Sequence, residues 1–538
     1  MLLAELVTTS QAVAATGSRL AKREALAALL RRCPPGDVEI AVTYLAGDLR
    51  QRRTGVGWAG LRGLPAPAES PTLTLATVDA AFERASRLFG EGSATARAAV
   101  VADLFGRATA HEQAFLRGLV SGDVRQGALD AAMLDAVAAA AVVPLPDVRR
   151  AAMLCGSTAD VAVAALTGGT EAVRALGLVV GRPIRPMLAS SAPDVAAAFA
   201  KAAGDALVLD AKLDGIRIQV HRDGEQVAVF TRSLDDITGR LPEVADVVRA
   251  LPVRSAVLDG EAMTLDGSGR PRPFQDTASR TARQHTATPP PDPAPTAEAT
   301  ATPIGDLSSP AEVPAEPALA APVPGTVTPF FFDVLHLDGE DLIDRPLRER
   351  LARLDAVVPP PYRVARVPDV GVEEGRRFFA DMVAAGQEGV VVKSLSAPYE
   401  AGRRGAAWVK VKPRHTLDLV VLAVEWGSGR RQGWLSNIHL GARDPASGGF
   451  VMLGKTFKGM TDEMLAWQTD RFLGLEVSRT SYVVTVRPEQ VVEIAFDGLQ
   501  RSTRYPGGVA LRFARVVRYR DDKTAAEADT LDTVRALL

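Results

Sequence analysis

The sequence predicts three successive domains: an all-helical domain, a mixed α+β domain and a small β-barrel. The chain has 538 residues, too many for a single hydrophobic core. Its pattern also changes twice along the chain. Ala- and Leu-rich stretches with a helical period give way to short β runs near residue 181, and a second series of short β runs follows Pro413.

Residues 1–178 form the predicted helical domain. Stretches such as 77–88 and 127–141 repeat apolar residues at i, i+3, i+4 and i+7, and Pro- and Gly-rich breaks separate them. The first residues carry an acid at position 5 and no basic segment. They therefore indicate a first amphipathic helix rather than a signal peptide.

Residues 182–412 form the predicted α+β domain. Its first β runs flank the dipeptide Asp223-Gly224, which is typical of a hairpin turn. Further β runs and one helix, over 372–385, follow. The segment 286–325 differs from them, because it holds 11 of the 36 prolines, five acids and no basic or aromatic residue. Such a composition predicts a disordered insertion.

Residues 413–538 form the predicted barrel. Short β runs separated by Gly-rich turns continue over about 125 residues, with one helix over 462–474. This number of strands with one helix suits an OB-fold, a small five-stranded barrel.

Composition limits the classes of protein. The net charge is −2, with 62 basic and 64 acidic residues, which excludes a uniformly basic coat protein but not a local basic surface. Two cysteines, Cys33 and Cys155, exclude a disulfide scaffold and a four-cysteine zinc site. No apolar run approaches the roughly 20 residues that span a bilayer. We therefore expect a soluble cytoplasmic protein.

Lysine is scarce, since only nine of the 62 basic residues are lysines. Arginine cannot lose its proton in a protein, whereas lysine can act as a nucleophile. A lysine in this chain therefore more often marks a position where an amine is needed. The clearest is Lys212 in the hexapeptide Lys-Leu-Asp-Gly-Ile-Arg, where Arg217 and a flexible glycine could hold a nucleotide.

Six further motifs follow this hexapeptide in order. They are Arg232-Ser233, Leu258-Asp259-Gly260-Glu261, Phe330-Phe331-Phe332-Asp333, Glu388-Gly389-Val390-Val391-Val392-Lys393, Trp408-Val409-Lys410-Val411-Lys412 and Arg518-Tyr519-Arg520-Asp521-Asp522-Lys523. With the hexapeptide they resemble the ordered motifs of the ATP-dependent DNA ligases in the nucleotidyltransferase superfamily. The resemblance covers nearly the whole chain.

The resemblance implies a role for each matching residue. Lys212 matches the nucleophile that attacks the ATP α-phosphorus, a step that needs a neutral amine. Glu261 and Glu388 match carboxylates that bind a divalent metal, for which Mg²⁺ suits oxygen ligands. Phe332 matches the aromatic residue that stacks on adenine. The full set of implied ATP-binding residues is Asp210, Arg217, Arg232, Glu261, Phe332, Lys393, Arg404, Lys410, Lys412, Arg520 and Lys523. Asp210 departs from the family pattern, which has Glu there.

The resemblance also implies nicked duplex DNA as the partner, with the helical domain as a DNA-binding domain. The implied DNA-contacting residues are Arg125, Gly127 and Arg280. The stretch 501–523 carries seven basic residues against two acids and is the clearest basic surface segment. We expect a monomer; a sliding-clamp partner and the pathway served are left open by the sequence.

Three alternatives remain beside an ATP-dependent DNA ligase. An RNA ligase or a capping guanylyltransferase shares the lysine motif, although the helical domain and the last motif favour a DNA ligase. An NAD-dependent ligase is disfavoured, because two cysteines cannot build its zinc module. A non-catalytic nick-binding protein is disfavoured by the intact hexapeptide.

Overall fold

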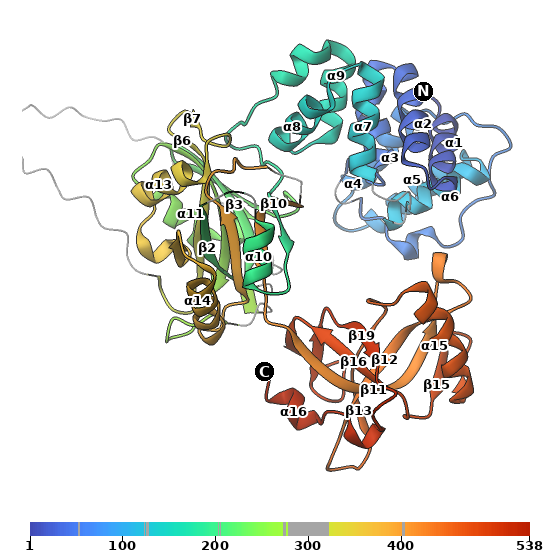
Figure 1. Ribbon diagram of the computed structural model, residues 1–538. Helices are drawn as coiled ribbons and strands as arrows, with labels where there is room; N and C mark the ends of the chain where they lie inside the picture. The colour runs from blue at the N-terminus through green and yellow to red at the C-terminus, as the bar shows by residue number, and fades with distance from the viewer. Residues whose placement is uncertain are drawn as a thin grey trace, which may run out of the picture.

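The computed structural model describes residues 1–51, 54–122, 124, 129–202, 204, 206–272, 276–277, 322–400 and 404–537. These form a helical, a mixed and a strand-rich region in chain order (Figure 1). The helical region is blue to cyan, and the strand-rich region is orange to red. Within the ranges just given, no helix is both long and apolar enough to cross a membrane.

The helical region contains nine α-helices among its described residues. Several begin where a Ser or Thr side chain accepts a hydrogen bond from the first turn, as Ser18 and Thr109 do. Their apolar faces share one core. The helices are α1 (Leu3–Ala15), α2 (Arg19–Arg32), α3 (Val38–Leu45), α4 (Leu75–Ser86), α5 (Ser93–Gly106), α6 (Ala110–Ser121), α7 (Leu129–Ala141), α8 (Leu145–Cys155) and α9 (Thr158–Arg174).

Helix α8 attaches the helical region to the mixed region. Met153 and Leu154, at its end, belong to an apolar cluster with Met187, Tyr399 and Trp408 of the mixed region. These contacts bury side chains of both regions in one core. Apolar packing, and not polar surface contacts alone, therefore holds the junction together.

The mixed region is built on two five-stranded sheets. One has the order β1-β10-β9-β2-β8 and the other the order β4-β3-β5-β6-β7. Strand β2 leads directly into β3, so the chain passes from one sheet to the other just after Lys212. The strands are β1 (Leu188–Ser191), β2 (Leu207–Lys212), β3 (Ile216–Asp223), β4 (Gln226–Thr231), β5 (Ser255–Thr264), β6 (Val327–Leu337), β7 (Glu340–Asp341), β8 (Arg366–Pro368), β9 (Gly389–Ser394) and β10 (Arg404–Val411).

Sequence patterns located several of these elements. The predicted hairpin joins β3 and β4, with Gly224 at φ 58°, and the predicted helix is α14 (Val372–Ala384). Three helices were not predicted: α10 (Val195–Lys201), α11 (Pro242–Arg249) and α13 (Leu347–Val357). The predicted insertion 286–325 lies outside the described residues except for 322–325.

The C-terminal region is rich in strands. In its seven-stranded sheet the long strand β11 pairs with β12 along one edge and with β16 and β15 along the other. The predicted helix is α15, Asp462–Gly474. The remaining elements are β11 (His415–Trp426), β12 (Leu435–Arg443), β13 (Phe450–Thr456), β14 (Glu476–Arg479), β15 (Val483–Val486), β16 (Val491–Phe496), β17 (Gly498–Arg501), β18 (Val509–Arg512), β19 (Arg515–Tyr519) and α16 (Leu531–Arg535).

Candidate active site

A cavity of about 910 Å³ lies where the two sheets of the mixed region meet. Its walls come from the ends of β2 and β3, from β5, β6, β9 and β10, and from the C-terminal region. Nine predicted site residues with described side chains line it: Asp210, Lys212, Arg217, Arg232, Glu261, Phe332, Lys393, Lys410 and Lys412. Glu388, predicted as a metal ligand, lines it too.

Lys212 is the last residue of β2 and its amine reaches the cavity. Antiparallel pairing sets Lys212 opposite Gly389, the first residue of β9. The preceding residue, Glu388, donates its backbone N–H to the Lys212 carbonyl at 2.8 Å. The Glu388 carboxylate forms ion pairs with the Nζ atoms of both Lys212 and Lys412. The register of β2 and β9 therefore gathers two amines on one carboxylate.

The turn after Lys212 depends on a glycine. The N–H of Gly215 donates to Glu261 Oε1 at 3.2 Å. A Cβ atom at this position would lie 2.4 Å from the Ala262 carbonyl oxygen and 2.9 Å from Glu261 Cγ. The glycine of the hexapeptide is thus needed for close approach of β3 to β5.

Glu261 sits on β5 and faces the same cavity. Burial raises its carboxyl pKa to about 7, although the nearby Lys212 and Arg217 cations oppose the shift. Glu388, which lines the same cavity, adds to the increase in this pKa by repulsion.

These two carboxylates fit a divalent metal of a particular kind. Among the described residues no group of three or more His, Cys, Asp or Glu side chains could enclose a metal ion. Mg²⁺ commonly takes one or two carboxylates and completes its shell with water and phosphate oxygens. Glu261 and Glu388 supply that number of protein oxygens.

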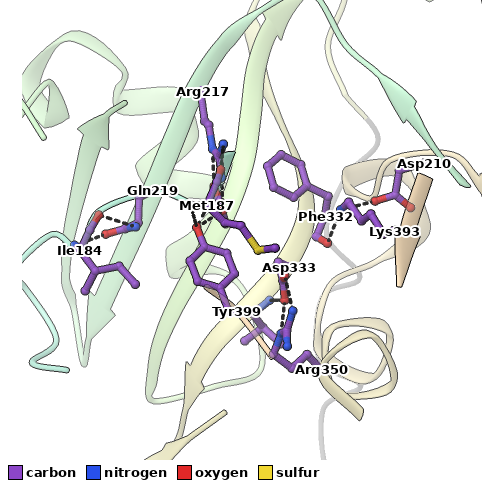
Figure 2. Close-up of polar contacts among 12 residues, drawn as sticks. Ile184, Met187, Asp210, Arg217, Gln219, Phe332, Asp333, Arg350, Lys393 and Tyr399 are labelled. Carbon is purple, nitrogen blue, oxygen red and sulfur yellow. Dashed lines mark hydrogen bonds and ion pairs between the residues drawn. The ribbon is translucent and has the colours of Figure 1, made fainter. Parts of the chain in front are cut away.

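Arg217 is held by a network of buried polar groups (Figure 2). Its Nε and Nη2 atoms donate to the two oxygens of Asp259 at 3.0 and 2.6 Å, and Nη1 donates to the Met187 carbonyl at 2.6 Å. The Tyr399 hydroxyl donates to Asp259 Oδ2 at 2.6 Å. Sequence reasoning quoted Asp259 within its motif and missed Tyr399 altogether.

Phe332, Trp408 and Lys393 form another wall of the cavity. The Lys393 Nζ lies 4.6 Å from the Phe332 ring centroid and 4.3 Å from that of Trp408. It also lies 2.5 Å from Asp210 Oδ2, and both side chains are 2% exposed. Neither Asp210 oxygen accepts a hydrogen bond of good geometry from a described group. Oδ1 thus has no hydrogen-bond partner among the described groups, whereas Oδ2 is paired with Lys393 (Figure 2).

The other predicted residues fall into three groups. Lys410 and Lys412 line the cavity, and the pKa of Lys412 is raised, because Glu388 and Asp497 outweigh the opposing effect of burial. Arg232 is exposed on the turn after β4. The side chain of Arg404, at the start of β10, lies outside the described structure, as do Arg125, Gly127 and Arg280.

Arg520 and Lys523 do not line the cavity. Both instead contact Asp418 near the start of β11: Arg520 Nη1 donates to Oδ2 at 3.0 Å and Lys523 Nζ to the same oxygen at 2.5 Å. Arg520 also donates to Asp522 through Nε and Nη2. In this arrangement the Asp418 and Asp522 carboxylates pair with the cations that were predicted to bind ATP.

The C-terminal region instead presents a different set of residues to the cavity. Lys458, Asp497, Phe513 and Arg515 line it. Arg512 donates to the Asp214 carboxylate at 2.6 Å, and Lys412 Nζ lies 3.1 Å from Asp497. The scarcity of lysine marks Lys458, and Arg512 and Arg515 lie in the predicted basic segment 501–523, but no sequence signal placed these residues at the cavity.

Comparisons with known proteins agree with the geometry. The family model described as "ATP dependent DNA ligase domain" matches residues 186–412, and the one described as "ATP dependent DNA ligase C terminal region" matches 431–523. Together they cover more than half of the chain.

Full-length relatives are close. A "Probable DNA ligase" of Beutenbergia cavernae is 65% identical and covers 100% of this chain and 99% of its own length. One of Nocardioides sp. is 62% identical with the same coverage. The solved structure "Pmar-Lig_PreS3" shares the fold, with a TM-score of 0.62 and 17% identity over 96% of this chain and 99% of that one.

The matched domains contain the cavity, its lysine and its carboxylates, and the relatives extend over the whole length. The chain belongs to the ATP-dependent DNA ligase family.

Proposed function

We propose that this ATP-dependent DNA ligase seals nicks in duplex DNA by taking AMP from ATP onto the Nζ of Lys212. The observation that carries the assignment is the placement of Lys212 in a cavity shared with further lysines and with the carboxylates of Glu261 and Glu388. A bond forms between Nζ and the α-phosphorus as the bond to the pyrophosphate oxygen breaks. AMP then passes to the 5′-phosphate of the nick, and the 3′-hydroxyl displaces it.

Each step is an in-line displacement at phosphorus, so positioning and charge stabilisation supply most of the catalysis. Lys410 and Lys412 line the cavity beside Lys212 and would stabilise the charge on the α-phosphate oxygens. Lys212 must lose its ammonium proton before it attacks.

A divalent metal serves this family, and Glu261 and Glu388 are the residues that would hold it. When bound, it would neutralise phosphate charge. Contacts within the protein orient both carboxylates. Glu261 accepts a hydrogen bond from the N–H of Gly215, and Glu388 is paired with Lys212 and Lys412.

We assign the base to the wall made by Phe332, Trp408 and Asp210. An aromatic face suits stacking, and the Asp210 carboxylate can accept from the 6-amino group of adenine. Guanine has a carbonyl oxygen in place of this amino group, and a carboxylate repels that oxygen. GTP is therefore expected to be a poor donor.

We propose that the C-terminal region is an OB-fold and that the helical region binds the duplex. Strand β11 pairs through its first half with β16 and through its second half with β15, which supports a sheet curling into a barrel. Helix α15 lies between β13 and β14, which suits the one-helix barrel that the sequence predicts. The protein is proposed to act as a monomer on nucleoid DNA.

Incubation with ATP labelled at the α-phosphate, followed by denaturing separation, tests the proposal. We expect a labelled protein band for the wild type, and none for Lys212→Ala or Lys212→Arg, because neither side chain offers a neutral amine. The loss in nick sealing should exceed about 10³-fold. A labelled band at wild-type intensity in either variant would place the nucleophile elsewhere.

A further inference from the structure

The Tyr399 hydroxyl lies at the junction of three segments of the mixed region. It donates to Asp259 Oδ2 on β5 at 2.6 Å and accepts from the Met187 N–H at 2.9 Å and from Arg217 Nη2 on β3 at 3.3 Å. A phenolic hydroxyl has one donor and two acceptor sites, so all of its capacity is used. The side chain is 2% exposed, in contact with the cavity wall through Trp408, whose ring centroid lies 5.9 Å away.

This hydroxyl orients both groups that hold Arg217. Asp259 receives the guanidinium through two oxygens and is fixed further by the tyrosine. The Met187 carbonyl, which accepts from Nη1, belongs to the residue whose N–H donates to Tyr399. Figure 2 shows Tyr399, Met187 and Arg217 converging. Without the hydroxyl, Asp259 and Met187 would each lose one of the hydrogen bonds that orient them toward Arg217.

Arg217 has one donor left for a ligand. A guanidinium carries five N–H groups. Four are directed to Asp259, Met187 and Tyr399, and the fifth, on Nη1, meets no acceptor among the described residues. The Arg217 side chain is 16% exposed and lines the cavity. Because the guanidinium can only donate, the group it reads must be an acceptor.

The family resemblance already implies that Arg217 holds the nucleotide. We propose that Tyr399 is the positioning residue that aims this N–H of Arg217 at a hydroxyl of the sugar, so that the preference for a ribonucleotide depends on the Tyr399 hydroxyl. The inference rests on the proposed function. A site that hydrogen-bonds a substrate hydroxyl rejects the analogue lacking it, because its buried polar group is left unpaired. The 2′- and 3′-hydroxyls offer the same chemistry, and the assay distinguishes them.

The test compares Lys212 adduct formation with ATP, 2′-deoxyATP and 3′-deoxyATP in the full-length wild type and in Tyr399→Phe. The variant keeps the ring and removes only the hydroxyl. We expect kcat/KM for ATP to fall about tenfold while that for one deoxy analogue changes less than about twofold, so that the preference narrows. In the wild type, the analogue that lacks the contacted hydroxyl should have a lower kcat/KM than ATP. The analogue for which this difference narrows in Tyr399→Phe identifies the contacted hydroxyl as the 2′ or the 3′.

Other outcomes overturn the inference. If ATP and both analogues lose activity equally in Tyr399→Phe, the hydroxyl has only a structural role. If the wild type accepts all three donors equally, no sugar hydroxyl is read. Tyr362→Phe is the matched control, a buried tyrosine of the same region outside the cavity lining, and should leave the preference unchanged.

Arg217→Lys separates the inference from the proposed function. It should abolish the preference but retain a labelled adduct. An unchanged preference in Arg217→Lys would refute the sugar contact itself, whereas absence of any adduct in the wild type would refute the proposed function.

Discussion

Lys212, Gly215 and Glu261 form a unit in which each residue depends on the others. Glu261 Oε1 accepts from the Gly215 N–H, and the Lys212 cation lowers the pKa of Glu261 against the stronger effect of burial. Because the turn between Lys212 and Gly215 connects the two sheets, its backbone path fixes where the amine enters the cavity. A change of one methyl group there should therefore affect both stability and catalysis.

Gly215→Ala tests this dependence. The new Cβ would meet the Ala262 carbonyl oxygen at 2.4 Å, so β3 and β5 must separate. We expect a loss of roughly 1–3 kcal/mol in the free energy of unfolding and a marked fall in adduct formation. Denaturant titration and the labelled-ATP assay measure the two effects. Gly239→Ala, where a Cβ meets nothing within 4 Å, is the control. Equal behaviour of the two variants would contradict the steric argument.

Strand β3 also anchors the segment that joins the helical and mixed regions. His221, on β3, is 1% exposed and accepts from the Gly181 N–H at 3.0 Å. Gln219, two residues earlier, accepts from the Ile184 N–H at 2.8 Å. Burial, aided by repulsion from His336, lowers the pKa of His221 to about 3. The folded chain therefore keeps this imidazole neutral where an unfolded chain would protonate it.

Because of His221, the free energy of unfolding should decrease as the pH is lowered. Below its unfolded pKa, near 6.5, the unfolded state binds a proton that the folded state does not bind until near 3. The free energy of unfolding should thus drop by roughly 2 kcal/mol between pH 8 and pH 5 from this residue. Denaturant titrations at both pH values compare the wild type with His221→Gln, which lacks the titration. Parallel pH profiles for the two proteins would refute the effect.

The two strands that flank the predicted insertion pair directly with each other. Thr264, which ends β5, lies opposite Val327, which begins β6. A short connection can therefore join them. Closure entropy changes slowly with loop length.

Deleting 286–321 and inserting a short Gly/Ser linker should leave the melting temperature and nick sealing within about twofold of the wild type. Thermal melting and a sealing assay check this. A Gly/Ser segment of the original length is the control for composition. Loss of sealing at an unchanged melting temperature in both variants would assign the segment a role in catalysis or partner binding.

For the molecule as a whole, the C-terminal region presents one face to the cavity and keeps another set of cations away from it. Arg512 and Asp497 contact Asp214 and Lys412 of the mixed region. Arg520 and Lys523 remain on Asp418, within their own region. If the latter pair orients the ATP phosphates, as the resemblance implies, the C-terminal region must take a second position during adduct formation. A domain that completes a site for one step only is a known form of gating.

Arg520→Ala and Lys523→Ala should therefore block adduct formation with ATP while sparing the sealing of a nick already adenylated at its 5′-phosphate. The two assays, run at several salt concentrations, separate this from simple DNA binding. If the cations only contact DNA phosphates, sealing of the adenylated nick should fall as well, and more steeply as salt rises. Equal loss in both assays would contradict the two-position hypothesis.

Much of the site was predictable because its residues lie in short segments whose chemistry is local. The order of the motifs, the scarcity of lysine and the hairpin after β3 located Lys212, Glu388, Lys410 and Lys412, and the cavity includes them all. Strand and helix periods likewise located α14 and α15 to within one residue. Short helices such as α10 escaped, since seven residues carry too little periodicity.

By itself the sequence determined the three-region order and the family and pointed to Lys212 as the candidate nucleophile, because periodicity and motif order are properties of neighbouring residues. Only the tertiary structure decided which distant groups meet: Tyr399 with Arg217, Arg512 with Asp214, and Asp418 with Lys523. These pairs are separated by more than 100 residues. Strand register and the packing of one region on another bring them together, and neither can be read from local composition.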